Sequence, residues 1–252
     1  YGIAPLVCDP TIAAIGAKAA KMMRHAKAQE SRLEREIEKR EALMHDVEYD
    51  ERLKLHPEPY FRQNLLLSKD LSIFYGDRCV ANGISLTLNR GDRIALVGRN
   101  GCGKSSLLKL LIGQPIAHTG TLEIGSRLTV SYVPQDMSFL SGSADDFAAE
   151  SEIDITLFKT ILRKLDFKRT QFTKDMSEFS MGQKKKVLLA RSLCQRANLY
   201  IWDEPLNYID VISRLQIETL ILEYKPTMLF VEHDEAFVND IATKVCRISL
   251  NQ

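Results

Sequence analysis

The side chains with the most recognisable chemistry lie in one glycine-rich segment, GRNGCGKS at residues 98–105. An apolar run at 94–97 precedes this segment, and residues 106–112 are predicted to be a helix. In a strand–loop–helix arrangement, glycines allow successive backbone N–H groups to turn inward and form a nest for anions. The first turn of the following helix adds positive potential. The segment therefore predicts a phosphate-binding loop, the P-loop.

Two side chains of the P-loop suit the phosphates and the metal ion of a nucleoside triphosphate. Lys104 would place a positive charge near the β- and γ-phosphates, and the Ser105 hydroxyl would be a ligand of Mg²⁺. ATP and Mg²⁺ are therefore the expected cofactors. The P-loop residues expected to bind them are Gly98, Asn100, Gly101, Cys102, Gly103, Lys104, Ser105 and Ser106.

The cysteines give a weaker signal. The five are Cys8, Cys79, Cys102, Cys194 and Cys246. An odd number without metal-ligand spacing favours reduced thiols in a cytosol. Four of them are expected to be buried apolar residues. Cys102 occupies an unconstrained position of the P-loop, where its thiol could be alkylated.

A pair of acids follows the P-loop at a distance of about a hundred residues. The apolar run at 199–202 ends in Asp203 and Glu204. Such a run is a weak signal alone and a strong one after a P-loop, where it predicts a Walker B strand. Asp203 is then expected to hold Mg²⁺ through water, and Glu204 to orient and deprotonate the attacking water.

Between these two motifs lies FSMGQ at residues 179–183, which resembles the Leu-Ser-Gly-Gly-Gln signature of ATP-binding-cassette (ABC) ATPases. The resemblance runs from about residue 68 to 252. It implies that Gln135 senses Mg²⁺ and the attacking water, and that His233 is the switch histidine at the γ-phosphate. The further residues implied to contact nucleotide are Tyr75 against adenine, Ser180, Gly182 and Gln183 of the signature, and Asp210 of the segment that resembles the D-loop, residues 207–210.

Each of these residues also has a plainer interpretation. Tyr75 could be a core aromatic residue, Gln135 a surface amide, and His233 a core histidine. The signature itself departs from the family pattern, because Met181 replaces its first glycine and Phe179 its leading leucine. In ABC ATPases the signature of one cassette closes over ATP held by another. Met181 is therefore expected to affect that composite site and not the P-loop of this chain.

The elements that position these residues alternate from Arg93 onward between short apolar strands and amphipathic helices, as in an α/β domain with a largely parallel sheet. Two earlier strands are expected at 65–74 and 80–88. We therefore predict an α/β P-loop NTPase fold: an ABC nucleotide-binding domain with a helical signature subdomain over residues 61–252.

Residues 1–60 are predicted to be a linker, with a tip loop and one long helix from about residue 11 to 50. The apolar stripe of this helix is thin, which suits packing on one partner helix. Its first half gathers Lys18, Lys21, Arg24 and Lys27 without an acid between them. A solvated face is the general explanation for such a run.

A charged helix directly before a cassette resembles the ABC-F proteins, in which a helical linker joins two cassettes that act on ribosomes. The segments at 202–214, 226–233 and 20–24 resemble the Lsa/Vga group of antibiotic-resistance ABC-F proteins. Within the second segment, Glu232 stands where most ABC-F proteins would have Ser or Thr. The resemblance implies protection of the ribosome from peptidyl-transferase-centre antibiotics. The implied partners are 23S rRNA and tRNA, met by the linker, and the first cassette of the same full-length chain or a dimer mate.

Two other functions stay open at this point: a housekeeping ABC-F translation factor, and the ATPase subunit of an ABC transporter whose partners supply the membrane helices. The 252-residue chain has a net charge of +1, which gives no global signal for nucleic acid. No apolar run approaches the ~18 residues of a membrane span. The first residues lack a Met and a basic signal region, so we expect a cytoplasmic protein and a fragment of a longer chain.

Overall fold

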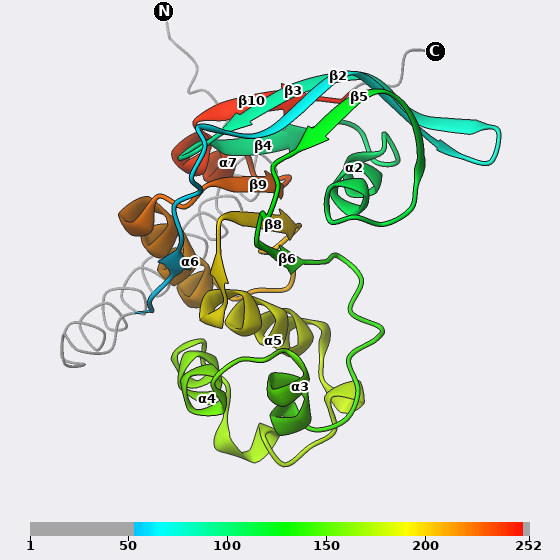
Figure 1. Cartoon of the computed structure of the whole chain (residues 1–252). Helices are drawn as coiled ribbons and strands as arrows, with labels where there is room; N and C mark the ends of the chain where they lie inside the picture. Colours follow the sequence, from blue (N-terminus) through cyan, green and yellow to red (C-terminus); the bar gives the residue numbers. More distant parts are fainter. Residues whose placement is uncertain (1–52, 249–252) are drawn as a thin grey trace, which may run out of the picture. The chain divides into compact units, whose positions relative to one another are not determined.

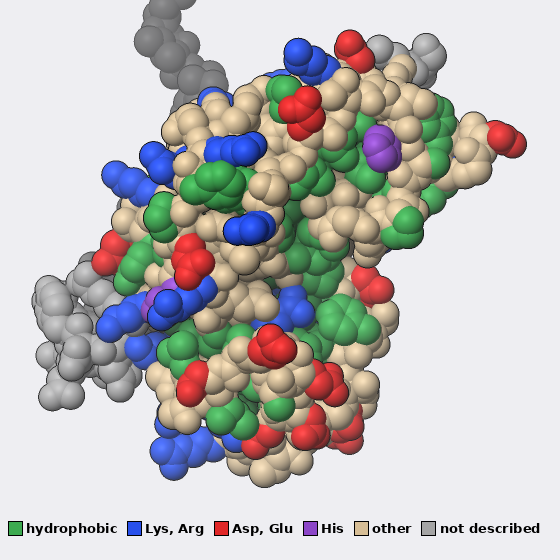
Figure 2. Space-filling view, in the orientation of Figure 1, with side chains coloured by type: hydrophobic (Ala, Val, Ile, Leu, Met, Phe, Trp, Pro, Cys, Tyr) green, Lys and Arg blue, Asp and Glu red, His purple; other side chains and the backbone are tan. Residues whose placement is uncertain are grey.

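The structure is a computed structural model in which residues 53–248 are described. The predicted tip loop and long helix, with Lys18, Lys21, Arg24 and Lys27, lie outside the described residues. The described residues form one compact unit that begins at Leu53. Figure 2 shows side chains of both charges on the visible face, with Lys and Arg more frequent in the upper left of the view and Asp and Glu in the lower part.

A five-stranded parallel sheet forms the centre of this unit, in the order β10-β4-β9-β8-β6. Every residue of the neighbouring strands β8 and β9 is buried, as expected for parallel strands covered on both faces. The prediction of a largely parallel α/β fold is confirmed. The strands are β4 (Arg93–Val97), β6 (Val130–Val133), β8 (Leu199–Asp203), β9 (Met228–Val231) and β10 (Lys244–Arg247).

A second sheet is antiparallel and three-stranded, with β2 (Asn64–Tyr75) between β3 (Arg78–Asn89) and β5 (Ala117–Ile124). The strands predicted at 65–74 and 80–88 lie within β2 and β3. The turn between them contains Gly76, whose φ of +57° suits glycine. The face of this sheet that carries Leu71 and Ile73 packs in one core with Leu107 and Leu108 of the helix after the P-loop.

The helices fall into two groups, which Figure 1 separates clearly. Helices α2, α6 and α7 lie by the sheets, whereas α3, α4 and α5 lie together in the lower part of the view as the predicted helical subdomain. The helices are α2 (Lys104–Leu111), α3 (Ala144–Glu150), α4 (Ile155–Lys164), α5 (Met181–Cys194), α6 (Val211–Tyr224) and α7 (Glu235–Ile241), with short 3₁₀ turns at Arg169–Gln171 and Met176–Glu178.

Side-chain caps explain where the longer helices begin. Asp210 accepts a hydrogen bond from the Ser213 N–H at 2.9 Å at the start of α6. Ser180 and Gln183 form a reciprocal capping box at the start of α5. Each cap satisfies an N–H group that the first helical turn leaves without an intrahelical partner. Two of these capping residues, Ser180 and Asp210, belong to the predicted site.

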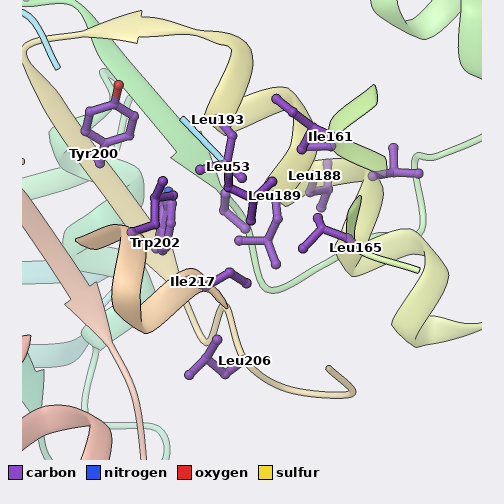
Figure 3. Packing of buried hydrophobic residues seen from close by; sticks show 14 of the residues in the cluster. Leu53, Ile161, Leu165, Leu188, Leu189, Leu193, Tyr200, Trp202, Leu206 and Ile217 are labelled. Carbon is purple, nitrogen blue, oxygen red and sulfur yellow. The ribbon is translucent and has the colours of Figure 1, made fainter. Parts of the chain in front are cut away.

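The larger core joins the parallel sheet to the helical subdomain. Trp202 and Tyr200 of β8 are fully buried and belong to one cluster with Leu189 and Leu193 of α5. The Trp202 indole N–H donates to the Ser192 hydroxyl at 2.9 Å, so the polar group of this buried ring is satisfied. Figure 3 shows these side chains gathered between the strand and the helix.

The first described residues already belong to this core. Leu53 and Leu55 are buried in it, and β1 (His56–Pro57) pairs in parallel with β7 (Arg196–Ala197). The Glu58 N–H donates to the Ala197 carbonyl at 2.8 Å. The end of the segment predicted as linker is thus anchored at the junction between α5 and β8. The boundary at residues 60 and 61 itself stays a prediction.

Candidate nucleotide site

The P-loop connects β4 to α2, and its glycines are required by close packing as well as by dihedral angles. Gly103 has a φ of +88°, and a Cβ atom there would lie 2.6 Å from the Ala81 Cβ. A Cβ atom on Gly98 would lie 2.4 Å from the Ile248 carbonyl oxygen. Gly101 also has a positive φ, of +79°. The loop can therefore curl tightly at the carboxyl end of β4 with its backbone accessible.

Lys104 is the first residue of α2, and its side chain folds back over the P-loop. Its ammonium group donates to the carbonyl oxygens of Gly98 at 2.9 Å and Arg99 at 3.2 Å. The residue is only 6% exposed, so these two bonds satisfy a largely buried charge. A cavity of about 310 Å³ lies next to it, lined in part by Gly98, Glu232 and His233. The P-loop and the predicted switch histidine thus border one space.

Asp203 ends β8, the strand two places from β4 in the sheet, and has the surroundings of a cation ligand. Both carboxylate oxygens are buried and lack a hydrogen-bond partner among the described residues. Burial raises the pKa of Asp203 above its ordinary value, whereas the Ser105 hydroxyl and the charges of Lys185 and Lys104 oppose that shift. The Ser105 hydroxyl is close enough to act on this pKa without meeting the geometry of a full hydrogen bond. An orphaned buried carboxylate beside a hydroxyl fits the oxygen ligands of Mg²⁺.

Glu204 comes next in the chain, but its carboxylate is well supplied with donors. Gln135 Nε2 donates to Oε2 at 2.9 Å, and Asn207 Nδ2 donates to the same oxygen at 2.6 Å. His233 Nε2 lies 3.3 Å from Oε1. The left-handed backbone of Glu204, with a φ of +49°, turns its side chain out of the strand direction. The structure therefore brings together three residues that were predicted separately: Gln135, Glu204 and His233.

Two contributors to the acid pair were missed by the sequence reasoning. Asn207 was not predicted as a site residue, although its position three residues after Glu204 suits a turn that hydrogen-bonds back. Lys185 stands in a run of three lysines at 184–186 and was not predicted as a site residue either. It is only 1% exposed, and its ammonium donates to the carbonyl oxygens of Pro134 at 3.1 Å and Asp203 at 3.5 Å.

The sequence did carry a signal for Lys185. The buried residues Leu188, Leu189 and Ser192 follow it at three, four and seven positions, which is one face of a helix. Desolvation lowers the pKa of Lys185, and the carboxylates of Asp203, Glu204 and Glu232 act to raise it again. A buried cation thus lies beneath the acids of the site.

The signature residues have roles inside this chain. Gln183 Oε1 accepts from the Ser180 N–H at 3.0 Å, which forms half of the α5 cap. A Cβ atom on Gly182 would lie 2.6 Å from the Tyr208 carbonyl oxygen, so the D-loop passes directly over this glycine. Asp210 pairs with Lys186 at 2.6 Å. Among the hydrogen bonds of residues 53–248, none joins the signature to Gln135, Glu204 or His233.

The exposed fractions of Tyr75, His233 and Gln135 test the plainer interpretations of these residues. Tyr75 is 47% exposed at the end of β2, so it is not a core aromatic residue. The His233 side chain is 50% exposed, which excludes a core histidine. Gln135 is exposed as a surface amide would be, yet its amide bonds Glu204. All three side chains are accessible to a ligand.

The expected burial of the cysteines was wrong, although the described ones are free thiols. Cys102 is 2% exposed, because its side chain packs beneath the P-loop against Gly98, and its thiol is therefore not open to alkylation. Cys79, Cys194 and Cys246 are only half-buried. Burial raises the pKa of the Cys194 thiol to about 12, so the thiolate that reacts is scarce even there. Cys8 lies outside the described residues.

A phosphate cradle at the end of one parallel strand, with an acid pair at the end of another, defines a P-loop ATPase. Comparison with known proteins narrows the class. The family model described as "ABC transporter" matches residues 81–207, about half of the chain. The chain therefore belongs to the ABC family, and the matched part is its ATP-binding cassette, an ATPase domain.

Individual relatives show which ABC proteins this chain is similar to. It is 36% identical over 193 residues to the ATP-binding protein YdiF of Bacillus subtilis, covering 73% of this chain and 30% of that protein. Identity to ABC transporter F family member 2 of Arabidopsis thaliana is 29%, over 74% of this chain and 28% of that protein. The ribosome protection protein VmlR of Bacillus subtilis is 27% identical over 93% of this chain and 43% of that protein. The chain thus spans less than half the length of these relatives, which include ABC-F proteins.

A solved structure shows the same fold. An inward-facing metal-chelate type ABC transporter aligns with a TM-score of 0.57 and 25% identity, covering 75% of this chain and 80% of that one. Within residues 53–248 of the present chain, we find no helix with the length and apolar character that crossing a membrane requires.

Proposed function

We propose that this chain is the second cassette and linker of an ABC-F protein that binds the ribosome and protects it from antibiotics of the peptidyl-transferase centre. The similarity to VmlR carries this proposal. That alignment covers 93% of the chain, which leaves about 18 of 252 residues outside it. It therefore includes part of residues 1–52, which precede the cassette, and not the ATPase domain alone.

The P-loop side of the proposed ATP site is complete in this chain. Gly98, Asn100, Gly101, Cys102, Gly103, Lys104, Ser105 and Ser106 would surround the phosphates, and Tyr75 would stack on adenine. Ser105, Gln135 and Asp203 would hold Mg²⁺, which when bound neutralises charge on the β- and γ-phosphate oxygens. The orphaned carboxylate of Asp203 supports this assignment.

Glu204 is proposed as the general base for the attacking water. It is hydrogen-bonded to Gln135 and Asn207 and lies next to His233, which fixes the orientation of its carboxylate. His233, which lies next to Oε1 of Glu204, would contact the γ-phosphate. The arrangement lets one residue accept the water proton while its neighbours orient the reacting groups.

We expect Glu204→Gln to keep ATP binding and to lower the hydrolysis rate by about 10²–10⁴-fold, the usual contribution of a general base. An intact protein carrying it should stay bound to ribosomes in the presence of ATP. Steady-state ATPase assays and ribosome pelleting measure both effects. Lys104→Ala is the contrasting variant, because it should weaken nucleotide binding itself. Hydrolysis at the wild-type rate in Glu204→Gln would refute the general-base role.

The signature side of the site would act on ATP held by another cassette, either the first cassette of the same chain or a dimer mate. Large apolar side chains are exposed around it: Met181 at 48%, Tyr208 at 66% and Val211 at 67%. Exposed apolar groups gathered along one surface are typical of an interaction site. Ser180, Gly182, Gln183 and Asp210 would then complete the second active site.

The basic half of the linker, with Lys18, Lys21, Arg24 and Lys27, would meet phosphates of 23S rRNA beside tRNA. Such contacts are sensitive to salt and independent of sequence. ATP binding would close the cassettes with the linker in the ribosome, and hydrolysis would release it. On this proposal the protein would act in the cytoplasm.

Expression of the complete gene in a drug-sensitive host tests the proposal. Inhibitory concentrations of lincosamides, pleuromutilins or streptogramin A should rise, and the same gene with Lys104→Ala should give no protection. Unchanged inhibitory concentrations for all three classes would exclude the resistance role. A growth defect on gene deletion without a drug phenotype would favour a housekeeping translation factor. Copurification with membranes instead of ribosomes would favour a transporter subunit.

A further inference from the structure

We infer that Glu232 is a positioning residue of the ATPase site, which ties the loop carrying Glu204 to the loop carrying His233. Glu232 directly follows β9 and is only 5% exposed. It stands where the family resemblance leads one to expect Ser or Thr. The inference rests on the proposed roles of Glu204 and His233 and is independent of the proposed action on ribosomes.

The two carboxylate oxygens of Glu232 serve different loops. Oε1 accepts a hydrogen bond from the backbone N–H of Leu206 at 2.9 Å. Oε2 accepts one from the backbone N–H of His233 at 3.0 Å. One rigid planar group therefore joins the turn after β8 to the turn after β9.

Each of the two loops carries a side chain that lies against the carboxylate of Glu204, the proposed general base. Leu206 lies between Glu204 and Asn207, and the Asn207 amide donates to Glu204 Oε2 at 2.6 Å. On the other loop, His233 Nε2 lies 3.3 Å from Glu204 Oε1. A shift of either loop would pull one of these groups from Glu204. Glu232 thus acts on Glu204 through the backbone that carries its two neighbours.

A buried carboxylate is costly unless hydrogen bonds and a counter-charge compensate it. The two backbone N–H groups supply charge-assisted hydrogen bonds. The buried ammonium of Lys185 interacts favourably with Glu232 as well as with Asp203 and Glu204. A Ser or Thr hydroxyl has one oxygen on a shorter side chain, so it could not offer a separate acceptor to each loop.

Glu232→Gln in the complete protein is the direct test. The amide keeps the shape but has one acceptor oxygen, so its NH₂ group must face one of the two N–H donors. We expect kcat for ATP hydrolysis to fall about tenfold, while KM for ATP changes less than about twofold. Glu223→Gln is the matched control, since this exposed acid of α6 does not line the cavity. It should leave kcat unchanged.

A double-mutant cycle with His233→Ala separates positioning from general damage. If Glu232 acts through both loops, Glu232→Gln should lower kcat less in a His233→Ala background than in the wild type, and less than about twofold when His233→Ala and Asn207→Ala are combined. A full tenfold loss in all three backgrounds contradicts the inference. So does a wild-type kcat in Glu232→Gln while His233→Ala and Glu204→Gln are impaired, and that result leaves the proposed catalytic roles intact. A wild-type kcat in Glu204→Gln instead overturns the catalytic role on which the inference rests.

Amide hydrogen exchange in the wild-type protein tests the same contacts without any variant. The backbone amides of Leu206 and His233 should exchange more than about tenfold more slowly than in an unstructured peptide, because each donates to a buried carboxylate. Exchange of either amide at the unstructured rate would contradict the inference, even if Glu232→Gln failed to fold.

Discussion

Asp203 and Glu204 are adjacent in the chain, yet the structure surrounds their carboxylates in opposite ways. Asp203 is 1% exposed, and no group of residues 53–248 forms a hydrogen bond with either oxygen. Glu204 has Gln135, Asn207 and His233 around its oxygens. The first arrangement leaves lone pairs for the proposed cation, whereas the second fixes the direction of the proposed base. Two carboxylates of the same chemistry are thus suited to different tasks by their neighbours.

The raised pKa of Asp203 makes a prediction about stability. A folded-state pKa above the unfolded value means that the folded protein favours the protonated acid, so this residue stabilises the fold at low pH. That contribution is lost as pH rises through the folded-state pKa. Without Mg²⁺ and nucleotide at pH 7, Asp203→Asn should therefore raise the free energy of unfolding by roughly 1 kcal/mol while abolishing Mg²⁺-dependent ATP binding. Thermal unfolding against pH measures the first effect.

Asp136→Asn is the control, because the pKa of Asp136 is shifted in the opposite direction to that of Asp203. Hydrogen bonds from the backbone and hydroxyl of Ser138 lower the pKa of Asp136, so its stabilising effect exists above the unfolded pKa and is lost as pH falls through the folded value. This variant should not raise the melting temperature at pH 7. A melting temperature of Asp203→Asn at or below that of wild type would contradict the assignment of a buried carboxylate without hydrogen-bond donors.

At the scale of elements, α5 connects the two sides of the nucleotide machinery. Its first turn holds the signature and its cap at Ser180, and Gly182 lies under the D-loop. One turn later, Lys185 contacts the carbonyl groups of Pro134 and Asp203. Lys186 pairs with Asp210 of the D-loop at 2.6 Å. A movement of the signature relative to the acid pair would therefore have to strain this one helix.

Gly182→Ala tests how closely the D-loop is seated on α5. Helix propensity favours Ala over Gly by about 1 kcal/mol, which alone would predict stabilisation. The added Cβ atom would lie 2.6 Å from the Tyr208 carbonyl oxygen, and overpacking against backbone costs about 1–3 kcal/mol. We expect a lower free energy of unfolding in urea. Met181→Ala, at an adjacent position that is 48% exposed, should have little effect. A more stable Gly182→Ala variant would show that the D-loop is not held there.

At the scale of the whole molecule, the described chain presents a complete P-loop and an exposed signature, which belong to two different composite sites in the proposed assembly. The apolar groups near the signature come from the start of α5, the D-loop and the first turn of α6. Leu53, Leu55 and β1 anchor the segment that leads into the cassette on the far end of α5, at β7. In the proposed assembly, one helix would therefore contact both the partner cassette and the base of the linker.

Val211→Asp should weaken the association of this cassette with its partner cassette without unfolding this cassette. Val211 is 67% exposed at the first position of α6, where the helix dipole tolerates a negative charge. In a Glu204→Gln background with MgATP, sedimentation analysis should show at least about tenfold weaker association. Leu222→Lys is the control, since Leu222 is 43% exposed in the last turn of α6, where a positive charge is tolerated. Equal association of both variants would place the interface elsewhere.

The local motifs were predictable because they depend on residues close together in the chain. The P-loop at 98–105, the acid pair after β8 and the alternation of β2 and β3 all follow from glycine dihedral freedom and from side-chain periodicity. Parallel strands could be expected from the order of apolar runs and helices. The meeting of Gln135, Glu204 and His233 was implied only by the resemblance to ABC ATPases.

Tertiary structure alone decided burial, charge compensation and close approach between distant segments. Cys102 and Lys185 are polar or reactive side chains whose burial depends on what packs over them, and no local pattern states that. One hydrogen bond joins Glu232 to Leu206, which lies 26 positions away, and the other joins it to the adjacent His233. The two bonds exist together only after β8 and β9 pair. The sequence by itself determined that a nucleotide site forms at the carboxyl ends of these strands. The pairing of the strands determined which charges hold that site in place, because contacts between loops are set by the sheet order and not by chain distance.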